Sequence, residues 1–410
     1  MKITHKGAGV TALVVSAGLL LTACSSTTEE GASPEPTDTA TASTLTVWVD
    51  AERTAEVQAA ADTYEAATGI DVEVVSRDNS TLKDDFIQQA NSGSGPDVVM
   101  GAHDWLGELV TNGVVAPIEL GDKSGDFLDV ALEASTYDGV VYELPFGVEN
   151  LAMLRNVDLV PEPVDTFDEM IAAGQAAGVE FPFVVEQGEN GNPYHLYPFQ
   201  TAFGAPVFGR DANGSYDPTQ LTLGDGTDFA IWLGEQGAAG TMSTEITGDI
   251  AKEKFTSGQA AFWLTGPWNV PSARDAGINF AVDVIPTPGP DAAQPFAGVK
   301  GFFVNEYSEN KLAANDFLVN YVATTEVQVA LFNNGGVLPA LRSAAEEVAS
   351  DPVVGGFLAA GEQAVAMPAI PQMGRVWEYW GIAEAAILNG ADPEATWAQL
   401  TADVEAAINS

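Results

Sequence analysis

The chain has 410 residues, of which 46% are apolar, 9% aromatic and 18% charged, so it is long enough to form two domains with buried cores. Its 58 acidic and 15 basic residues give a formal net charge of −43. The negative electrostatic field repels nucleic acid and anionic lipid headgroups. The composition therefore excludes a protein that binds nucleic acid or a lipid surface through basic residues. It suits a neutral or cationic ligand, although solubility or a saline habitat alone would also explain the acidity.

An export signal with a lipobox is predicted at residues 1–23. Lys2 and Lys6 are followed by an apolar stretch too short to span a bilayer, and then by Leu21-Thr22-Ala23-Cys24. We predict cleavage before Cys24, the only cysteine, and lipidation of its thiol at the extracellular face of the cell membrane. An ordinary signal peptide that contains a cysteine by chance is the alternative.

A disordered tether is predicted at residues 24–44. This stretch is made of small, polar and proline residues and cannot bury enough apolar surface to fold. Its mean reach as a flexible chain is roughly 25 Å. The folded body is expected to begin at Leu45, without an intramolecular disulfide because no second cysteine exists.

Strand and helix patterns alternate from Leu45 onward. The predicted order is strand 45–49, helix 54–67, strand 70–75, helix 82–90 and strand 98–100. This βαβαβ order predicts a mainly parallel sheet with right-handed crossovers. Ligands of such sheets bind at the carboxyl ends of the strands, here near 50–53 and 101–105.

A second α/β unit is predicted after Pro145. Its strands are expected at 148–155, 181–185, 260–265 and 280–285, with a further strand at 302–304. Helices are expected from the capping box at Thr166 to Glu169 and at 311–323, 326–333 and 373–388. Passages rich in Gly and Pro at 145–148 and 298–301 predict two crossings between the units, and hence a hinge with a ligand cleft.

The predicted N-terminal lobe is therefore 45–147 plus 301–345, and the C-terminal lobe is 148–300 plus 346–410.

Several motifs occur in a fixed order along nearly the whole mature chain. They are Leu45-Thr46-Val47-Trp48-Val49 with Glu52-Arg53, Gly95-Pro96-Asp97-Val98-Val99, Tyr142 to Leu151, Phe255 to Ala261, Gly266-Pro267-Trp268 and Met367 to Trp377. In these motifs the chain resembles the maltose/maltodextrin-binding proteins, the sugar-binding components of ABC importers. The resemblance implies a two-lobe α/β fold of the periplasmic-binding-protein type, a neutral oligosaccharide ligand and ABC permease subunits as partners.

The resemblance also implies which residues bind the sugar. Sugar hydroxyls form charge-assisted hydrogen bonds with carboxylates, and the C–H faces of the rings pack on aromatic side chains. Carried over position by position, the hydroxyl-binding residues are Glu52, Arg53, Asp104 and Glu149, and the stacking residues are Tyr194, Trp268 and Trp377.

Three positions depart from the family pattern. Asn192 stands where the family often has Glu, Gly101 where it has Trp, and Trp105 where it has Arg. Either an aromatic side chain has moved four residues along, which adds Trp105 to the ligand-binding residues, or the pocket has been reshaped. Oligosaccharide binding is expected in both cases, whereas the preference for glucose polymers is open.

Other conspicuous residues are expected to be structural. Trp48, Trp232 and Trp263 lie within strand or helix patterns and are predicted to be core residues. We interpret His103 as a structural hydrogen-bonding residue rather than a ligand.

Two alternatives to sugar import are considered. A secreted glycoside hydrolase would need a proton donor and a second carboxylate at a set separation, and the motifs contain no such pair. A receptor for a cationic peptide or polyamine on the same fold would suit the acidic field. We expect a monomeric binding protein without catalysis, metal, cofactor or nucleic-acid partner.

Overall fold

The computed structural model describes residues 44–210 and 216–409. The predicted signal peptide, Cys24 and all of the predicted tether except Thr44 lie outside the described residues. Within these two ranges, no helix combines the length and the apolar character that crossing a membrane requires.

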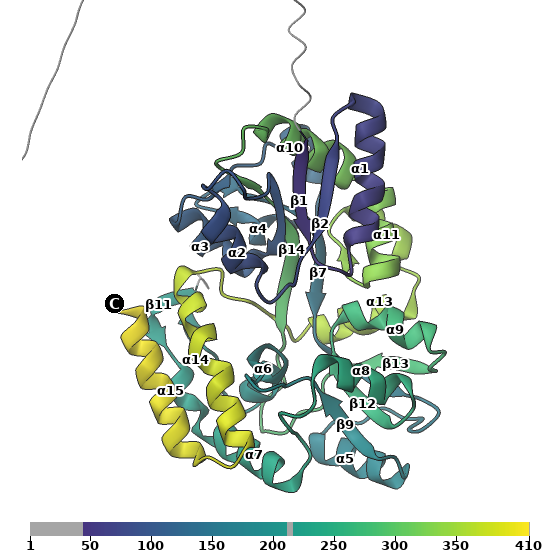
Figure 1. The fold of residues 1–410 in the computed structure, drawn as a ribbon. Helices are drawn as coiled ribbons and strands as arrows, with labels where there is room; N and C mark the ends of the chain where they lie inside the picture. The colour runs from purple at the N-terminus through teal and green to yellow at the C-terminus, as the bar shows by residue number, and fades with distance from the viewer. Residues whose placement is uncertain (1–43, 211–215, 410) are drawn as a thin grey trace, which may run out of the picture. The chain divides into compact units, whose positions relative to one another are not determined.

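The first sheet has eight strands and lies in the upper half of Figure 1. Its order is β15 (Leu338–Pro339), β7 (Glu143–Asn150), β14 (Phe296–Asn305), β3 (Val98–Ala102), β1 (Leu45–Val49) and β2 (Val72–Ser76), with β4 (Val115–Ala116) and β16 (Val365–Ala366) paired to β14. Its helices are α1 (Thr54–Thr68), α2 (Leu82–Gln89), α3 (Leu106–Thr111), α4 (Asp129–Ala134), α10 (Lys311–Phe317), α11 (Thr325–Gly335) and α12 (Arg342–Val348).

The second sheet has the order β13 (Phe280–Asp283), β8 (Ala152–Asn156), β12 (Ala260–Thr265) and β9 (Phe181–Val185). Contacts with it come from α5 (Phe167–Ala176), α8 (Gly248–Thr256) and α13 (Pro352–Gly361). The remaining helices of this half are α6 (Pro193–Thr201), α7 (Thr227–Ala239), α9 (Val270–Asp275), α14 (Pro371–Leu388) and α15 (Pro393–Ile408). Two hairpins, β5 (Thr136–Tyr137) with β6 (Val140–Val141) and β10 (Phe208–Arg210) with β11 (Tyr216–Leu221), stand apart from both sheets.

Most of the predicted elements are present. The strand at 45–49 is confirmed with its predicted bounds, and β1 pairs parallel with both β2 and β3. The capping box at Thr166 is confirmed as well, because Glu169 N–H donates to Thr166 Oγ1 and the Glu169 carboxylate accepts from Thr166 N–H. The predicted helix at 311–323 is α10 followed by a π-helical segment, Leu318–Val322.

The strand predicted at 148–155 is wrong. The chain instead forms two strands that Leu151 separates, β7 in the first sheet and β8 in the second. The strand predicted at 302–304 is the later part of the ten-residue β14. Because β14 runs antiparallel to both β3 and β7, and β8 runs antiparallel to both β12 and β13, the two sheets are mixed rather than mainly parallel.

The long strands also place the passages between the sheets. The chain changes sheet at Leu151 and again between Asp283 and Phe296, whereas the predicted crossings at 145–148 and 298–301 fall inside β7 and β14. Two clusters of buried apolar side chains lie mainly around the first and the second sheet, and a third joins β8 and β12 to α11 and β15. The lobe boundaries at 147/148, 300/301 and 345/346 stay predictions.

Candidate functional site

A cavity of about 1060 Å³ brings together residues from both halves of the fold. Its lining comes from the loop after β1, the ends of β3 and β7, the middle of β14, the first turn of α6, the loop after β12 and the first half of α14. All eight predicted ligand-binding residues line it, namely Glu52, Arg53, Asp104, Trp105, Glu149, Tyr194, Trp268 and Trp377. Their contact with a sugar stays a prediction.

Trp105 lies over the bare backbone of Gly101. A Cβ atom at position 101 would lie 2.5 Å from Trp105 Cε3, closer than two carbon atoms can approach. Trp105 belongs to the short 3-10 turn His103–Trp105 that follows the buried strand β3. The indole of Trp105 thus occupies the space beside position 101, and the two alternatives for this position stay predictions.

Trp268 likewise packs over the backbone of a glycine, Gly266. The buried strand β12 ends at Thr265, and the turn Pro267–Asn269 follows it, held by a 2.9 Å hydrogen bond from Asn269 Nδ2 to Thr265 Oγ1. A Cβ atom at Gly266 would overlap the Trp268 ring. The Gly-Pro-Trp sequence therefore directs this indole into the cavity.

Trp377 lies between the core and the cavity. Its ring stacks on the buried Trp380 with centroids 5.3 Å apart, and it meets the ring of Phe296 edge-on at 6.3 Å. Trp380 is fixed in turn by a 3.1 Å hydrogen bond from its Nε1 to Gln200 Oε1. One face of Trp377 is thus held by the core, while the residue also lines the cavity.

The first turn of α6 contributes Tyr194 and His195. Asn192 caps this helix by accepting a hydrogen bond from the His195 N–H at 3.3 Å. The Tyr194 hydroxyl is buried without a hydrogen-bond partner among the described residues. Burial, followed by the charges of Glu149 and Asp104, raises the pKa of Tyr194 well above its usual value. The hydroxyl is therefore a neutral donor close to both carboxylates.

The imidazole of His195 packs against the rings of Tyr194 and Trp268. Its ring meets that of Trp268 edge-on with centroids 6.1 Å apart. Burial lowers the pKa of His195 from 6.5 to about 4, so the ring is neutral at pH 7. Nδ1 has no partner among the described residues, which leaves it free to bond a ligand hydroxyl.

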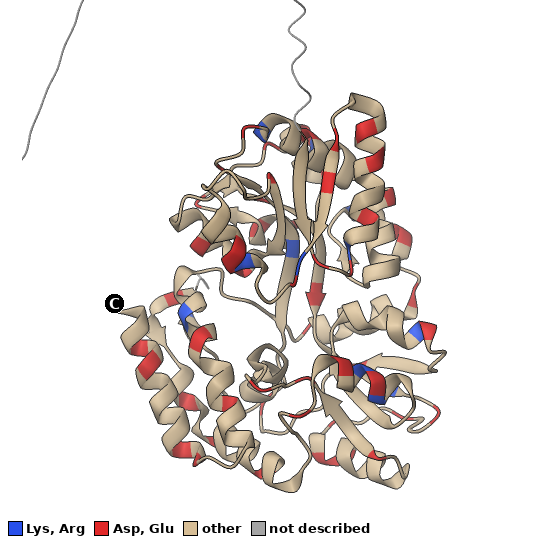
Figure 2. Ribbon diagram, viewed as in Figure 1, with Lys and Arg blue, Asp and Glu red and all other residues tan. Residues whose placement is uncertain are grey.

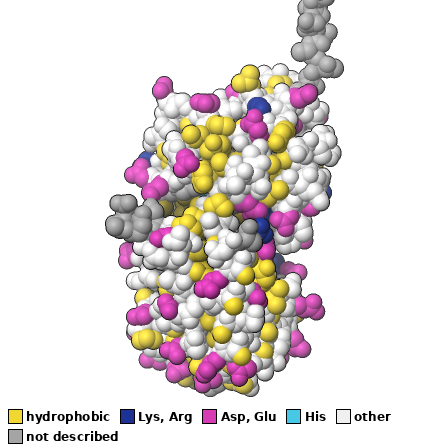
Figure 3. All heavy atoms as spheres, turned by 90° about the vertical axis from the view of Figure 1, so that its left-hand side faces the viewer, with side chains coloured by type: hydrophobic (Ala, Val, Ile, Leu, Met, Phe, Trp, Pro, Cys, Tyr) yellow, Lys and Arg dark blue, Asp and Glu magenta, His cyan; other side chains and the backbone are white. Residues whose placement is uncertain are grey.

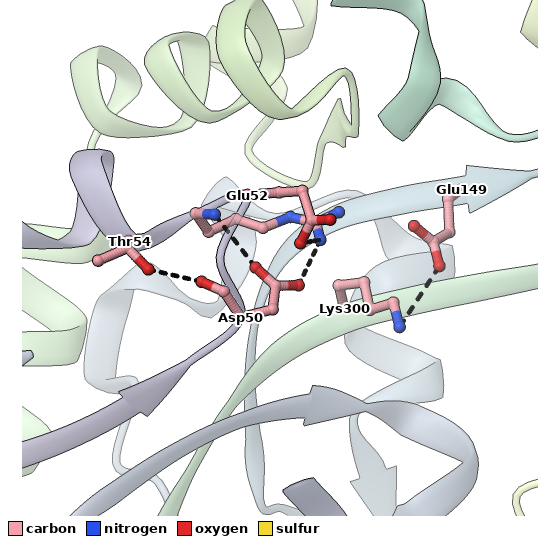
Figure 4. A network of polar contacts seen from close by, with 6 residues as sticks. Asp50, Glu52, Thr54, Glu149 and Lys300 are labelled. Atoms are coloured by element: carbon pink, nitrogen blue, oxygen red, sulfur yellow. Dashed lines mark hydrogen bonds and ion pairs between the residues drawn. The ribbon is translucent and has the colours of Figure 1, made fainter. Parts of the chain in front are cut away.

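Glu149 and Lys300 reach toward each other from the adjacent strands β7 and β14, as Figure 4 shows. Glu149 is paired with Gly298 across the ladder, and Lys300 lies two residues further on the same face. The Glu149 side chain passes beside Gly298, and its Oε1 lies 3.6 Å from Lys300 Nζ. Glu149 Oε2 is buried without a hydrogen-bond partner in the described structure.

A second charged group occupies the loop after β1 (Figure 4). The buried Arg53 guanidinium forms an ion pair with Asp50, and Glu52 Oε2 lies 3.9 Å from it. Thr54 Oγ1 donates to the Asp50 carbonyl oxygen at 2.7 Å, which fixes the loop at the start of α1. Glu52 is more exposed than either partner and faces the cavity mouth.

Several charged lining residues were missed by the sequence analysis, among them Glu186 and Lys300. Glu186 directly follows β9, so its place at a strand's carboxyl end was a usable signal. Burial raises the pKa of Glu186, and a hydrogen bond with Asn192 partly offsets this. A carboxylate therefore lies beside Asn192 in the cavity lining.

The structural role predicted for His103 is confirmed. Val299 N–H donates to His103 Nδ1 at 3.0 Å, so the proton is on Nε2, which lies 3.3 Å from the carbonyl oxygen of Met367. Burial lowers the pKa of this histidine and keeps it neutral. His103 therefore links β3, β14 and the segment before α14. In the described ranges, no group of His, Cys, Asp and Glu side chains is arranged to hold a metal ion.

Residues 59–355 match the family model described as bacterial extracellular solute-binding protein. The chain belongs to this family. This solute-binding protein is 30% identical over 326 residues to a maltotriose-binding protein of Pyrococcus abyssi, covering 75% of this chain and 69% of that one. It is also 28% identical over 387 residues to a maltooligosaccharide ABC transporter solute-binding lipoprotein of Streptococcus pneumoniae, with 91% and 90% covered.

A solved structure resembles this solute-binding protein over most of its length. It is the maltotriose binding protein of Thermus thermophilus bound with maltotriose, with 32% sequence identity and a TM-score of 0.83. The match covers 89% of this chain and 100% of the other. The two-lobe α/β fold of the periplasmic-binding-protein type and the resemblance to sugar-binding relatives are both confirmed.

Proposed function

We propose that this protein captures a neutral oligosaccharide of the maltose or maltodextrin type and delivers it to the permease of an ABC transporter. The observation that carries the proposal is the convergence of Trp105, Tyr194, Trp268 and Trp377 with buried carboxylates in one cavity. Pyranose rings need aromatic faces and charged acceptors at once. The relatives named for maltotriose and maltooligosaccharides support this ligand class.

The size of the cavity supports an oligosaccharide rather than a single sugar ring. Its volume of about 1060 Å³ lies at the upper end of small-molecule pockets, which hold roughly 300–1,000 Å³. The aromatic side chains come from four separate elements, the turn after β3, α6, the turn after β12 and α14. Several rings can therefore be contacted at once.

Binding proceeds without chemistry in this proposal. Glu149 and Asp104 accept hydrogen bonds from sugar hydroxyls on one side, while Tyr194 and Trp268 supply contacts from the other. A ligand that contacts both halves binds the closed state more tightly than the open one. The difference between these two binding free energies is the amount by which the ligand favours closure. The closed protein then docks on permease subunits, and release is driven by ATP hydrolysis elsewhere in the transporter.

A related ligand is the second candidate. The chain is 26% identical over 381 residues to a galactooligosaccharide-binding protein of Bacillus subtilis. The departures at Gly101, Trp105 and Asn192 fall at positions where the resemblance implies contact with the sugar. A neutral oligosaccharide with a different linkage is therefore the alternative ligand on the same fold.

The sequence and the family support a cellular location for the proposed function. The lipobox at Cys24 and the lipoprotein relative support attachment to the outer side of the cell membrane through a lipid on Cys24. Globomycin, which blocks the lipoprotein signal peptidase, should cause the uncleaved precursor to accumulate in the producing bacterium. Absence of an accumulated precursor under globomycin would contradict lipid anchoring.

Isothermal titration calorimetry of the purified protein tests the ligand class. We expect saturable binding of maltotriose, with the sugar recovered intact afterwards. Binding of galactooligosaccharides in place of α-glucans would favour the second candidate. Binding of a polyamine or basic peptide, with no response to any sugar, would reject sugar capture.

A further inference from the structure

Four basic side chains line the cavity, and each forms an ion pair with a carboxylate of the same cavity. The pairs are Arg53–Asp50, Lys83–Glu108 at 2.8 Å, Arg375–Glu378 at 2.8 Å and Lys300–Glu149 at 3.6 Å. Within the described lining, every Lys and Arg is therefore already engaged by a protein carboxylate.

Carboxylates outnumber these cations. Eight Asp or Glu residues line the cavity with the four Lys or Arg residues, an excess of four negative charges. Asp104 and Glu186 form no ion pair with any described residue. A carboxylate, sulfate or phosphate on a ligand would lose its water among like charges, and this costs free energy unless a cation pairs with it.

Lys300 is the cation whose pairing matters most for a ligand. It lies in the middle of β14, between β7 and β3, with a side chain 15% exposed. Glu149 is its one ion-pair partner in the described structure, whereas Arg53 is held by two carboxylates. The side chains of Lys83 and Arg375 are more exposed, at 24% and 56%, so water can screen them.

We propose that the Lys300–Glu149 pair determines the charge specificity of the cavity. While Glu149 holds Lys300, the cavity offers an anionic ligand no free cation, and sugars that carry a carboxylate, sulfate or phosphate are rejected. Loss of the Glu149 charge frees the Lys300 ammonium for such a group. The inference rests on the proposed capture of oligosaccharides and adds which sugars are excluded and by which residues.

The test compares two ligands by calorimetry with the full-length protein in detergent. One is maltotriose, and the other is the same trisaccharide with one glucose replaced by glucuronic acid. In the native protein we expect the acidic sugar to bind at least about tenfold more weakly. In Glu149→Gln, maltotriose should bind more weakly, while the ratio of the two affinities should move toward equality or beyond it.

A matched control removes a carboxylate paired with a lysine elsewhere. Glu306 pairs with Lys311 at 3.4 Å and does not line the cavity. The Glu306→Gln variant should keep the native ratio of affinities, because it frees an exposed lysine outside the cavity. A change of ratio in this control equal to that in Glu149→Gln would assign the effect to net charge and overturn the role of the pair.

A second variant keeps the proposal open to refutation if Glu149→Gln fails to fold. Lys300→Gln leaves the Glu149 charge unpaired, so rejection of the acidic sugar should become stronger. The proposal is wrong if the native protein binds the acidic sugar well and Lys300→Gln abolishes that binding while leaving the affinity for maltotriose unchanged. Lys300 would then be a receptor for the anionic group. Equal native affinity for both sugars would also overturn it while leaving sugar capture intact, whereas failure to bind either would reject the proposed function itself.

Discussion

The indole rings of Trp105 and Trp268 each pack against the backbone of a glycine, Gly101 and Gly266 respectively. Each indole lies where a Cβ atom of Gly101 or Gly266 would have to be. The backbone at Gly266 is extended with φ −98°, so the absence of a side chain, and not a left-handed conformation, is what the site requires. Two glycines thereby decide where two of the cavity's aromatic faces lie.

Gly101→Ala tests this at the residue scale. The added methyl must displace Trp105 or Phe303, and overpacking of this kind costs about 1–3 kcal/mol. We expect weaker sugar binding by calorimetry and a lower melting temperature. Gly125→Ala is the control, because a Cβ atom there meets nothing within 4 Å. Native affinity in Gly101→Ala would mean either that Phe303 moves in place of Trp105 or that Trp105 does not contact the ligand.

Trp268→Ala and Trp377→Ala should each weaken sugar binding by about 1–3 kcal/mol, as expected for buried aromatic contacts. Trp→Phe at the same positions keeps a ring and should recover part of the loss. Melting curves measured beside the titrations show whether the fold survives. Unchanged affinity in both alanine variants would remove these residues from the site.

At the scale of single elements, α14 combines a cavity residue with a buried acid. Glu384 is fully buried, and neither of its oxygens has a hydrogen-bond partner among the described residues. Burial raises its pKa well above 4.5. A carboxyl whose pKa is raised on folding contributes stability below its unfolded pKa, and that contribution is lost as pH rises through the folded pKa.

Glu384→Gln should therefore raise the melting temperature by about 2–4 °C near neutral pH and change it little near pH 4, where native Glu384 carries its proton in either state. Differential scanning calorimetry at several pH values measures this. Glu405→Gln, on the exposed face of α15, is the control and should leave the curve unchanged. An equal gain at every pH would point to packing instead of ionisation.

The sequence predicted elements well where local signals exist and less well elsewhere. Thr166 and Glu169 predict the start of α5, because their side chains form capping hydrogen bonds within one helical turn. No comparable signal separates β7 from β8, because both strands are buried on both faces and Leu151 between them is apolar too. Lys300 gave no local sign either, since its partner Glu149 comes from a strand far away in the sequence.

At the scale of the whole molecule, acidic side chains outnumber basic ones on the described surface. Figure 2 shows Asp and Glu distributed over helices and loops around both sheets, and Figure 3 shows them spread across one face with few Lys or Arg between them. Repulsion among these charges opposes the compact state. The formal net charge of −43 therefore makes the fold's stability sensitive to ionic strength.

Added salt should stabilise the protein by screening this repulsion, with most of the gain below about 0.15 M, where the Debye length falls to roughly 8 Å. Melting temperatures in a NaCl series would measure the effect. Potassium chloride at equal ionic strength should act alike, since screening does not depend on the cation's identity. A melting temperature that falls between low and moderate salt would contradict the prediction.

The distribution of tryptophan over core and cavity has an optical consequence. Trp48, Trp263, Trp380 and Trp397 are almost completely buried, while Trp105, Trp268 and Trp377 line the cavity. Sugar that covers the second group should shift its fluorescence emission and shield it from acrylamide, leaving the emission of the first group as a constant background. The protein thus carries its own unlabelled reporter of ligand occupancy, and the emission lost with each Trp→Phe substitution would assign the signal to single indoles.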